Sequence, residues 1–420
     1  MKAIRSYPHA VITKKGERAA LQGHPWVYDA EVTDLFPSPD GKVIEDGELI
    51  DVLTDKGKFI GTGFYNSHSK IRIRLISRNA NDRFDESFWE RKIRYAWEYR
   101  QTVLGGKDSP DLKCCRVIFG EADGFPGLTV DRFDRILVVQ TLSLGIEKRK
   151  DVIFPLLVKI VEESGDKIDG IYERNDVAIR KLEGLTEGKG YYTLLDRKTP
   201  DYTSIDIVEN DVRYHVDFKE GQKTGFFLDQ KYNRLAVSKL AKDKRVLDCF
   251  THTGSFALNA AKGGAAHVRA VDISDMAVNM ARENAKLNGL DEKMSFVAAD
   301  VFDLLPQLAE SHDPEDQFDF IILDPPAFTK SRKTIDAAYR GYKEINLRAM
   351  RLLPRGGYLA TASCSHFMKE ELFIKMLQSA AHDAGRELRQ IEVRQQAPDH
   401  PILWNVPETN YLKFFLFQIV

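Results

Sequence analysis

The stretch that decides the fold runs from residue 245 to residue 261 and reads RVLDCFTHTGSFALNAA. Its first part is a short apolar run typical of a buried strand, and SFALNAA has the composition and spacing of a helix. Thr253, Gly254 and Ser255 lie between them. Small residues at that point let backbone amides approach a ligand closely at the start of a helix. The stretch therefore predicts a strand, a ligand-binding loop and a helix.

The same alternation of strand and helix continues from about residue 205 to the end of the chain. Apolar runs rich in Val and Ile alternate with helical segments, which implies right-handed crossovers and a parallel sheet. We expect Ser274 to cap the second helix and Gly289 to end it. Two closing strands, joined by a short non-helical connection, predict an antiparallel hairpin. The expected strands span residues 245–250, 267–273, 294–300, 318–324, 358–364, 389–396 and 410–420.

Two regions of different texture precede this α/β part. Residues 1–77 read as short strands separated by turns, including a KGE turn at 15–17, and predict a small β-barrel. Residues 78–204 combine helical patterns, among them 88–103, with further strands, and predict an α+β domain. The α/β domain then covers 205–420.

Composition limits the classes of protein that this chain can be. At 420 residues it is long enough for two or three domains. The 61 Lys and Arg against 63 Asp and Glu give a formal net charge of −2, so nucleic-acid binding requires a local patch. Four cysteines without a CxxC pair indicate reduced thiols in the cytoplasm. We find no signal peptide, no apolar run of the ~18 residues that span a membrane, and no metal-ligand pattern.

A carboxylate ends each of the first four strands of the α/β domain: Asp248, Asp272, Asp300 and Asp324. Ligands of open parallel sheets bind outside these strand ends. Asp272 follows Asp248 by 272 − 248 = 24 residues, which is the position at which an acid binds the ribose hydroxyls of nucleotide-type cofactors. Asp300, at the end of the third strand, is suited to bind an adenine amino group. Each could instead be a helix cap or a loop residue. Because the glycines of a dinucleotide fingerprint are missing, the series suggests an adenosine-containing cofactor without a diphosphate.

Several motifs at this spacing resemble class I S-adenosylmethionine-dependent methyltransferases: DCFTHTGSF, VDIS, AADVF, DPPAF and SCS. More narrowly, the chain resembles the large-subunit (23S) ribosomal RNA cytosine-C5 methyltransferase I family over essentially its whole length. That resemblance implies a Rossmann-like seven-stranded methyltransferase domain, an N-terminal PUA domain and an α+β linker domain. Blocks outside the catalytic motifs support it: LQGHPWVYDAEV, EADGFPGLTVDRF, YERNDVAIRKLEGL, GQKTGFFLDQ and YLKFF.

The resemblance implies S-adenosyl-L-methionine as the cofactor and large-subunit ribosomal RNA as the partner, with no membrane association. The assembly considered is a homodimer, which the sequence does not decide. Phe226 and Gln230 are assigned to the cofactor by similarity alone, because the residues themselves predict only a flexible loop bounded by glycines. The expected cofactor residues are Asp248, Phe250, Thr253, Gly254, Ser255, Asp272, Ile273, Asp300, Val301, Asp324, Phe226 and Gln230.

Cys364 is the expected catalytic nucleophile. Cytosine C5 attacks a sulfonium methyl group only after a thiolate has added to C6, which requires one cysteine at a strand end near the cofactor. Cys364, in Ser363-Cys-Ser365, matches the family nucleophile, although it could also be a small buried core residue. Asp324 is expected to contact the cytosine amino group or N3. Ala327 stands where related enzymes carry a second cysteine, so the base that removes the C5 proton is unassigned.

The remaining cysteines and the basic residues have plainer interpretations. We expect Cys249 to pack in the core. Cys114 and Cys115 point to opposite faces of a strand. Lys70, Arg72 and Arg74 share one strand face that could follow a phosphate backbone, or form an ordinary solvated face. The expected RNA-binding residues are Lys70, Arg72, Arg74, Arg78 and His24.

Two other functions fit the same residues. A methyltransferase for an exocyclic amine would use the DPPAF carbonyls and need no cysteine. An RNA-binding assembly factor would keep only a vestige of the cofactor site, which the intact acidic series and Cys364 disfavour.

Overall fold

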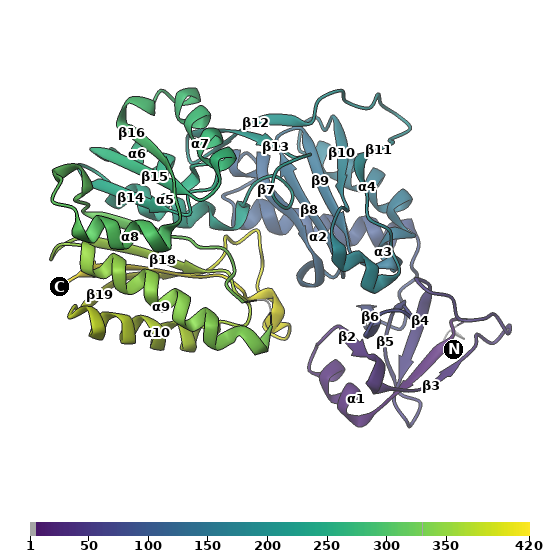
Figure 1. Cartoon of the computed structure of the whole chain (residues 1–420). Helices are drawn as coiled ribbons and strands as arrows, with labels where there is room; N and C mark the ends of the chain where they lie inside the picture. The colour runs from purple at the N-terminus through teal and green to yellow at the C-terminus, as the bar shows by residue number, and fades with distance from the viewer. Residues whose placement is uncertain (1–5, 330) are drawn as a thin grey trace. The chain divides into compact units, whose positions relative to one another are not determined.

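The computed structural model describes residues 6–329 and 331–420, which fold into two compact units. Each unit combines segments that are separated in the sequence. The predicted barrel and the α+β region share the first unit, although each has its own sheet (Figure 1). The first unit contains the residues up to 207 together with 216–228 and 398–409, and the second contains 208–215, 229–397 and 410–420.

A six-stranded sheet in the order β2-β6-β5-β4-β1-β3 forms the N-terminal part of the first unit. The predicted turn at 15–17 is wrong, because α1 (Lys14–Leu21) occupies these residues. Thr13 Oγ1 accepts a hydrogen bond from Gly16 N at 3.2 Å, and this cap stabilises a helix over a turn. The strands are β1 (His9–Ile12), β2 (Trp26–Tyr28), β3 (Val32–Phe36), β4 (Leu49–Leu53), β5 (Phe59–Tyr65) and β6 (Ile71–Ser77).

The α+β region has a five-stranded sheet in the order β11-β10-β9-β8-β7. The predicted helix at 88–103 is confirmed as α2 (Glu86–Val103), and Asp85 caps it by accepting from Phe88 N at 3.1 Å. Strand β11 and the hairpin β12–β13 were not predicted. The other elements are β7 (Cys114–Phe119), β8 (Leu128–Phe133), β9 (Ile136–Thr141), α3 (Leu144–Glu147), α4 (Lys150–Glu162), β10 (Gly170–Arg174), β11 (Lys189–Tyr192), β12 (Ser204–Glu209) and β13 (Val212–Asp217).

The second unit is built on a seven-stranded sheet in the order β16-β15-β14-β17-β18-β20-β19. The first five strands of this order are parallel, and β20 runs antiparallel to both of its neighbours. The predicted α/β sheet and its closing hairpin are confirmed, but the hairpin connection spans residues 395–412 and is not short. The strands are β14 (Arg245–Cys249), β15 (His267–Asp272), β16 (Met294–Ala298), β17 (Phe320–Leu323), β18 (Tyr358–Ser363), β19 (Leu388–Arg394) and β20 (Lys413–Ile419).

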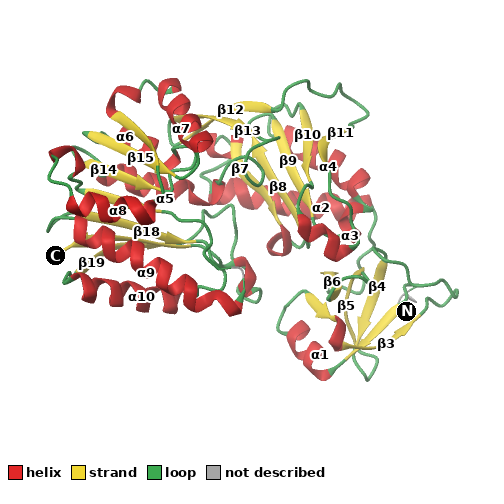
Figure 2. Cartoon of the chain, viewed as in Figure 1, coloured by secondary structure: helices red, strands yellow, loops and turns green. Residues whose placement is uncertain are grey.

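Helices cover both faces of this sheet (Figure 2). α5, α6 and α7 lie on one face, and α8, α9 and α10 lie on the other. Ser274 caps α7 by accepting from Ala277 N at 3.3 Å, and Gly289 follows the helix with φ +64°, as predicted. Among the described residues, no helix has the length and apolar character needed to cross a bilayer. The helices are α5 (Lys231–Leu240), α6 (Ser255–Lys262), α7 (Asp275–Leu287), α8 (Val301–Glu310), α9 (Ile335–Leu352) and α10 (Glu370–Ala384).

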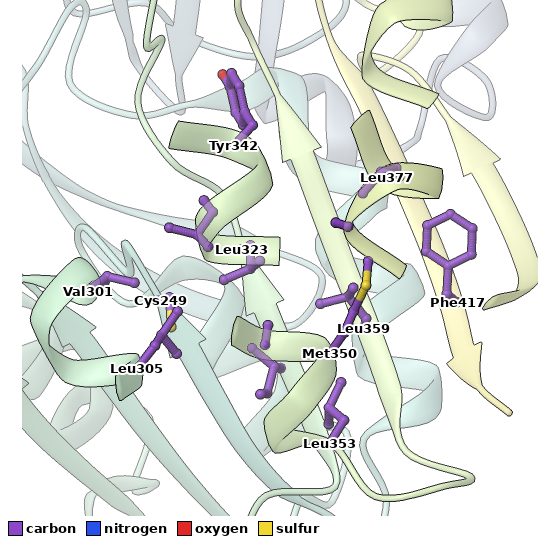
Figure 3. Close-up of a cluster of buried hydrophobic side chains, with 14 of the residues drawn as sticks. Cys249, Val301, Leu305, Leu323, Tyr342, Met350, Leu353, Leu359, Leu377 and Phe417 are labelled. Atoms are coloured by element: carbon purple, nitrogen blue, oxygen red, sulfur yellow. The ribbon is translucent and has the colours of Figure 1, made fainter. Parts of the chain in front are cut away.

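The main apolar core of the second unit lies between the sheet and α8, α9 and α10 (Figure 3). It contains Cys249, which is fully buried, together with Leu305 of α8 and Tyr342 of α9. The prediction that Cys249 packs as a core residue is therefore confirmed. Because this packing fixes Leu247 and Cys249 of β14, the loop that follows the strand starts from a rigid base.

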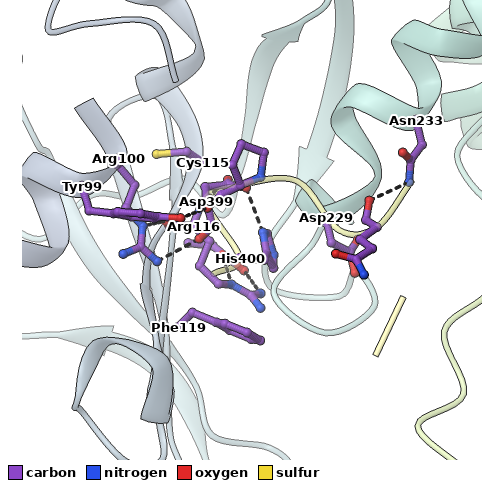
Figure 4. A network of polar contacts seen from close by, with 12 residues as sticks. Tyr99, Arg100, Cys115, Arg116, Phe119, Asp229, Asn233, Asp399 and His400 are labelled. Atoms are coloured by element: carbon purple, nitrogen blue, oxygen red, sulfur yellow. Dashed lines mark hydrogen bonds and ion pairs between the residues drawn. The ribbon is translucent and has the colours of Figure 1, made fainter. Parts of the chain in front are cut away.

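The segment 398–409 leaves the hairpin of the second unit and packs in the first. Arg100 Nη2 donates to Asp399 O at 2.8 Å, and Arg116 N donates to Asp399 Oδ2 at 2.9 Å (Figure 4). The His400 ring lies 5.5 Å from the Phe119 ring, centroid to centroid. Because Arg100 and Asp399 are fully buried, these bonds fix the segment firmly.

Candidate active site

The parallel strands of the second unit end at one edge of the sheet. Cys249 is paired with Val271 on β15 and with Leu323 on β17, and Leu323 is paired with Thr361 on β18. The residues that follow these positions therefore meet at this edge. Two predicted carboxylates, Asp272 and Asp324, and the predicted nucleophile Cys364 follow these positions, and Asp248 directly precedes Cys249 within β14.

The loop between β14 and α6 has an unusual backbone. Phe250, His252 and Gly254 all have positive φ, of 66°, 51° and 83°. A Cβ on Gly254 would lie 2.9 Å from Ala281 Cβ, so a glycine is required there. Residues other than glycine rarely adopt a positive φ, and such backbone strain is concentrated at binding loops. The loop thus curves tightly between β14 and α6, and the approach of its backbone amides to a ligand stays a prediction.

Asp248 stabilises this loop through hydrogen bonds to Thr251 and Ala257. Its Oδ2 accepts hydrogen bonds from Thr251 Oγ1 at 2.6 Å and from Ala257 N at 2.9 Å. Its Oδ1 and the Thr253 hydroxyl have no hydrogen-bond partner in the described parts of the chain, although both atoms are buried. Burial raises the pKa of Asp248 to about 7. A cationic or hydrogen-bond-donating ligand at this loop would satisfy both atoms.

Asp272 links the first two strand ends. Its Oδ2 accepts from His252 N at 2.9 Å, and its Oδ1 accepts from Ser274 N at 3.0 Å. The neighbouring Ile273 is 71% exposed, which is unusual for a large apolar residue and suits it to cover a flat ligand group. The Asp272 carboxylate thus fixes the backbone of the loop after β14, at His252, and of the loop after β15, at Ser274.

Asp300 and Val301 lie at the start of α8. Asp300 Oδ1 accepts from Phe302 N at 2.8 Å, so this exposed carboxylate is a helix cap, the alternative that its position after a strand left open. The Val301 side chain is buried in the apolar core. A cofactor contact by either residue stays a prediction.

Asp324 and Gln230 are brought together in the second unit. Gln230 Nε2 donates to Asp324 Oδ1 at 2.9 Å, and Gln230 Oε1 accepts from Asn233 at 2.6 Å. This pair fixes the carboxylate directly before the DPPAF prolines. Phe226 belongs to the first unit and is buried there, so its predicted cofactor contact stays a prediction.

Cys364 directly follows β18 and is partly exposed, whereas the other three cysteines are buried. Its neighbours Ser363 and Ser365 are buried, and both bond the Tyr342 hydroxyl at 3.0 Å. The Tyr342 ring also packs against Phe328 of the DPPAF loop, with the centroids 4.6 Å apart. Anchoring both serines inward leaves the thiol between them at the surface of the edge.

Two residues of this site were not predicted. Tyr342 supports the Cys364 loop from α9, and Lys413 at the start of β20 donates to Ser365 O at 2.7 Å. The signal for Lys413 is a lysine inside the otherwise apolar run of the last strand. A helical tyrosine such as Tyr342 carries no comparable signal, because its spacing is that of any core residue.

The predicted RNA-binding residues are largely engaged within the first unit. Arg74 pairs with Glu183 at 2.8 Å and Glu121 at 3.4 Å, and its side chain is 11% exposed. Arg72 pairs with Asp29, and Arg78 donates to Ala20 O and His24 O. His24 Nε2 lies 3.4 Å from Glu408. Lys70 is exposed and forms no ion pair with any described residue.

Comparison with known families agrees with this geometry. Residues 198–418 match the S-adenosylmethionine-dependent methyltransferase family, and residues 10–78 match the PUA-like domain family. A Streptococcus mutans protein assigned as an S-adenosylmethionine-dependent methyltransferase shares the fold, with a TM-score of 0.78 at 20% identity over 98% of this chain and 99% of that one. A second structure, assigned as a methyltransferase and complexed with S-adenosylhomocysteine, also shares the fold, with a TM-score of 0.79.

Sequence relatives cover the whole chain. "Ribosomal RNA large subunit methyltransferase I" of Klebsiella pneumoniae (strain 342) is 39% identical over 415 residues, which are 99% of this chain and 99% of the relative. The protein of the same name from Aeromonas salmonicida (strain A449) is 40% identical over 403 residues, 96% of this chain and 97% of the relative. Identity at this level over nearly the whole length of both chains shows that the chain belongs to the ribosomal RNA large subunit methyltransferase I family.

Proposed function

We propose that this protein methylates C5 of a cytosine in large-subunit ribosomal RNA, with Cys364 as the nucleophile. The observation that carries the proposal is the position of Cys364. Its thiol is partly exposed at the edge where the strands end, while the serines on both sides are buried and anchored to Tyr342. A thiol held at the surface between two inward-facing neighbours is available to a substrate, unlike a core cysteine.

The loop after β14 is suited to the cofactor. S-adenosylmethionine supplies an electrophilic methyl group and carries an ammonium and a ribose when it is bound. The partnerless Asp248 Oδ1 and Thr253 hydroxyl fit a group with hydrogen-bond donors, and Asp272 is the residue for the ribose hydroxyls. Phe250, Gly254 and Ser255 of this loop, together with Ile273 after β15, would contact the cofactor. Asp300 and Val301 would contribute only from the start of α8.

Cys364 performs the covalent step. Its thiolate sulfur forms a bond to C6 of the cytosine, and the C5=C6 electron pair moves to C5, which becomes a nucleophile toward a methyl group. After methylation a base removes the C5 proton. The electrons of that C–H bond restore C5=C6 while the S–C6 bond breaks and the thiolate returns. Asp324, which Gln230 fixes, would bind the cytosine amino group or N3.

The partner proposed for the first unit is RNA. PUA-like barrels and a basic strand face are suited to phosphate contacts, and a ribosomal substrate would place the work in the cytoplasm. Because Arg74 is compensated by two largely buried carboxylates, whereas Arg72 pairs with the exposed Asp29, we assign the phosphate contacts of that face to Lys70 and Arg72.

A covalent trap tests the nucleophile. RNA containing 5-fluorocytosine has no C5 proton to lose, so the adduct between Cys364 and C6 should accumulate and survive denaturing electrophoresis. Cys364→Ala should abolish the adduct and lower turnover by at least about a thousandfold, with cofactor affinity nearly unchanged. Cys249→Ala is the matched control and should lower stability while the adduct forms normally. Substantial turnover by Cys364→Ala would instead favour methylation of an exocyclic amine, which needs no thiol.

Asp272→Ala should weaken S-adenosylmethionine binding by about 1–3 kcal/mol, because it leaves the ribose and the amides of His252 and Ser274 without an acceptor. Titration calorimetry measures this change. Asp275→Ala is the control, since Asp275 is an exposed residue in the first turn of α7. Equal affinities for the two variants would remove Asp272 from the cofactor site.

Cofactor affinity should depend on pH through Asp248. The pKa of its buried carboxyl is raised to about 7, and only the ionised form attracts an ammonium group. The affinity for the cofactor is therefore highest above that pKa. It should fall about tenfold between pH 8 and pH 6, because protons compete with the cofactor for the carboxylate. Asp248→Asn should remove the dependence. A flat calorimetric profile for the unaltered protein would exclude Asp248 as the ammonium ligand.

Salt dependence separates the basic residues of β6. Lys70→Ala and Arg72→Ala should each flatten the slope of log affinity against log salt by about 0.7–0.9, the value of one phosphate contact. Arg74→Ala should leave the slope unchanged and lower the stability of the protein, because it removes the cation that pairs with Glu121 and Glu183. Filter binding to ribosomal RNA at several salt concentrations gives these slopes. Unchanged slopes for all three variants would make this an ordinary solvated face.

A further inference from the structure

Lys413 is a buried cation without a buried anion beside it. The residue is 5% exposed, and its Nζ donates to Ser365 O at 2.7 Å and to Tyr411 O at 2.8 Å. Across residues 6–329 and 331–420, no carboxylate lies within ion-pair distance of this ammonium. Burying a charge is unfavourable unless an opposite charge compensates it. Two carbonyl oxygens compensate only in part, so the position favours a nearby anion.

The strand register and one hydrogen bond place Lys413 beside the loop that carries Cys364. Lys413 on β20 is the antiparallel partner of Ser363, the residue before Cys364. The residue after Cys364 is Ser365, whose carbonyl accepts from Lys413 Nζ. The lysine is thus tied to the backbone on both sides of the cysteine. Since Tyr342 holds both serines, the loop cannot move away from the ammonium without breaking several buried bonds.

The ammonium is the major form of Lys413 at neutral pH. Burial lowers its pKa to about 8, while Cys364 and Glu370 act in the opposite direction by favouring the charged form. Tyr342 on α9 is neutral there, because burial raises its pKa. The other charges that face this edge are Glu370 in the first turn of α10 and Asp324 after β17. Both are carboxyl groups, which carry no positive charge in either protonation state, so the positive charge of this group comes from Lys413.

We infer that the Lys413 ammonium holds Cys364 as a thiolate, which makes Lys413 a positioning residue that activates the nucleophile. Two opposite charges in a region with little water stabilise each other, and a neighbouring cation is the usual means of keeping a cysteine ionised. The importance of this pair for catalysis rests on the proposed function. The charge coupling itself does not, because it is a property of the protein without RNA.

Thiol alkylation measures the coupling directly. The rate of reaction of the full-length protein with iodoacetamide, followed against pH by mass spectrometry of the Cys364 peptide, reports the thiolate fraction. Lys413→Gln keeps an N–H donor for Ser365 O and removes the charge. It should lower the rate at pH 7 about tenfold and move the midpoint to higher pH by about one unit. Lys413→Arg keeps the charge and should restore most of the rate.

Controls separate charge from structure. Lys375→Met removes an exposed lysine of α10 and should leave the rate and its pH midpoint unchanged. If Lys413→Gln does not fold, Lys413→Arg decides: a midpoint close to that of the unaltered protein supports the inference, and a midpoint raised by one unit or more contradicts it. An unchanged midpoint in a folded Lys413→Gln protein would overturn the inference.

The proposed function can fail independently. A raised midpoint in Lys413→Gln together with no fluorocytosine adduct in the unaltered protein would keep the charge pair and reject cysteine catalysis. An unchanged midpoint in Lys413→Gln together with a fluorocytosine adduct in the unaltered protein would keep Cys364 as the nucleophile and reject Lys413 as its activator.

Discussion

The register of the parallel strands is the constraint on which the site depends. Because β14, β15, β17 and β18 are paired without offset, their last residues reach the same edge together. A slip of one residue in any strand would turn its terminal side chain to the other face. The apolar core under α8, α9 and α10 prevents such a slip, since it would bury the polar ends and expose Val and Ile.

Charge is divided along this edge in a way that suits two kinds of ligand. Asp248 and Asp272 form an acidic half around the tight loop after β14, which favours a cationic cofactor. Lys413 gives the half next to Cys364 a positive charge, which favours an anionic sulfur. The partition follows from topology. The acids come from neighbouring parallel strands, whereas the lysine enters from the opposite direction on the antiparallel strand β20.

Much of this arrangement could be predicted from the sequence, because parallel strands alternate with helices and leave a strong periodic signal. The seven-stranded sheet, its closing hairpin and the cap of α7 by Ser274 are all confirmed. Local signals failed where tertiary or capping interactions decide, as for the predicted KGE turn that is part of α1. Lys413 was missed because its hydrogen-bond acceptor, the carbonyl of Ser365, lies 413 − 365 = 48 residues earlier in the chain, and no local pattern encodes that contact.

The two compact units are interleaved along the chain, and this has a consequence for how the protein is made. The first unit needs residues 398–409, and the second needs β20, which ends at Ile419. Domains commonly fold as they emerge from the ribosome, starting with the N-terminal one. Here neither unit has all of its parts until the residues after 397 have been translated. Premature termination after residue 397 would therefore leave both units incomplete, so a truncated product would not retain one intact unit.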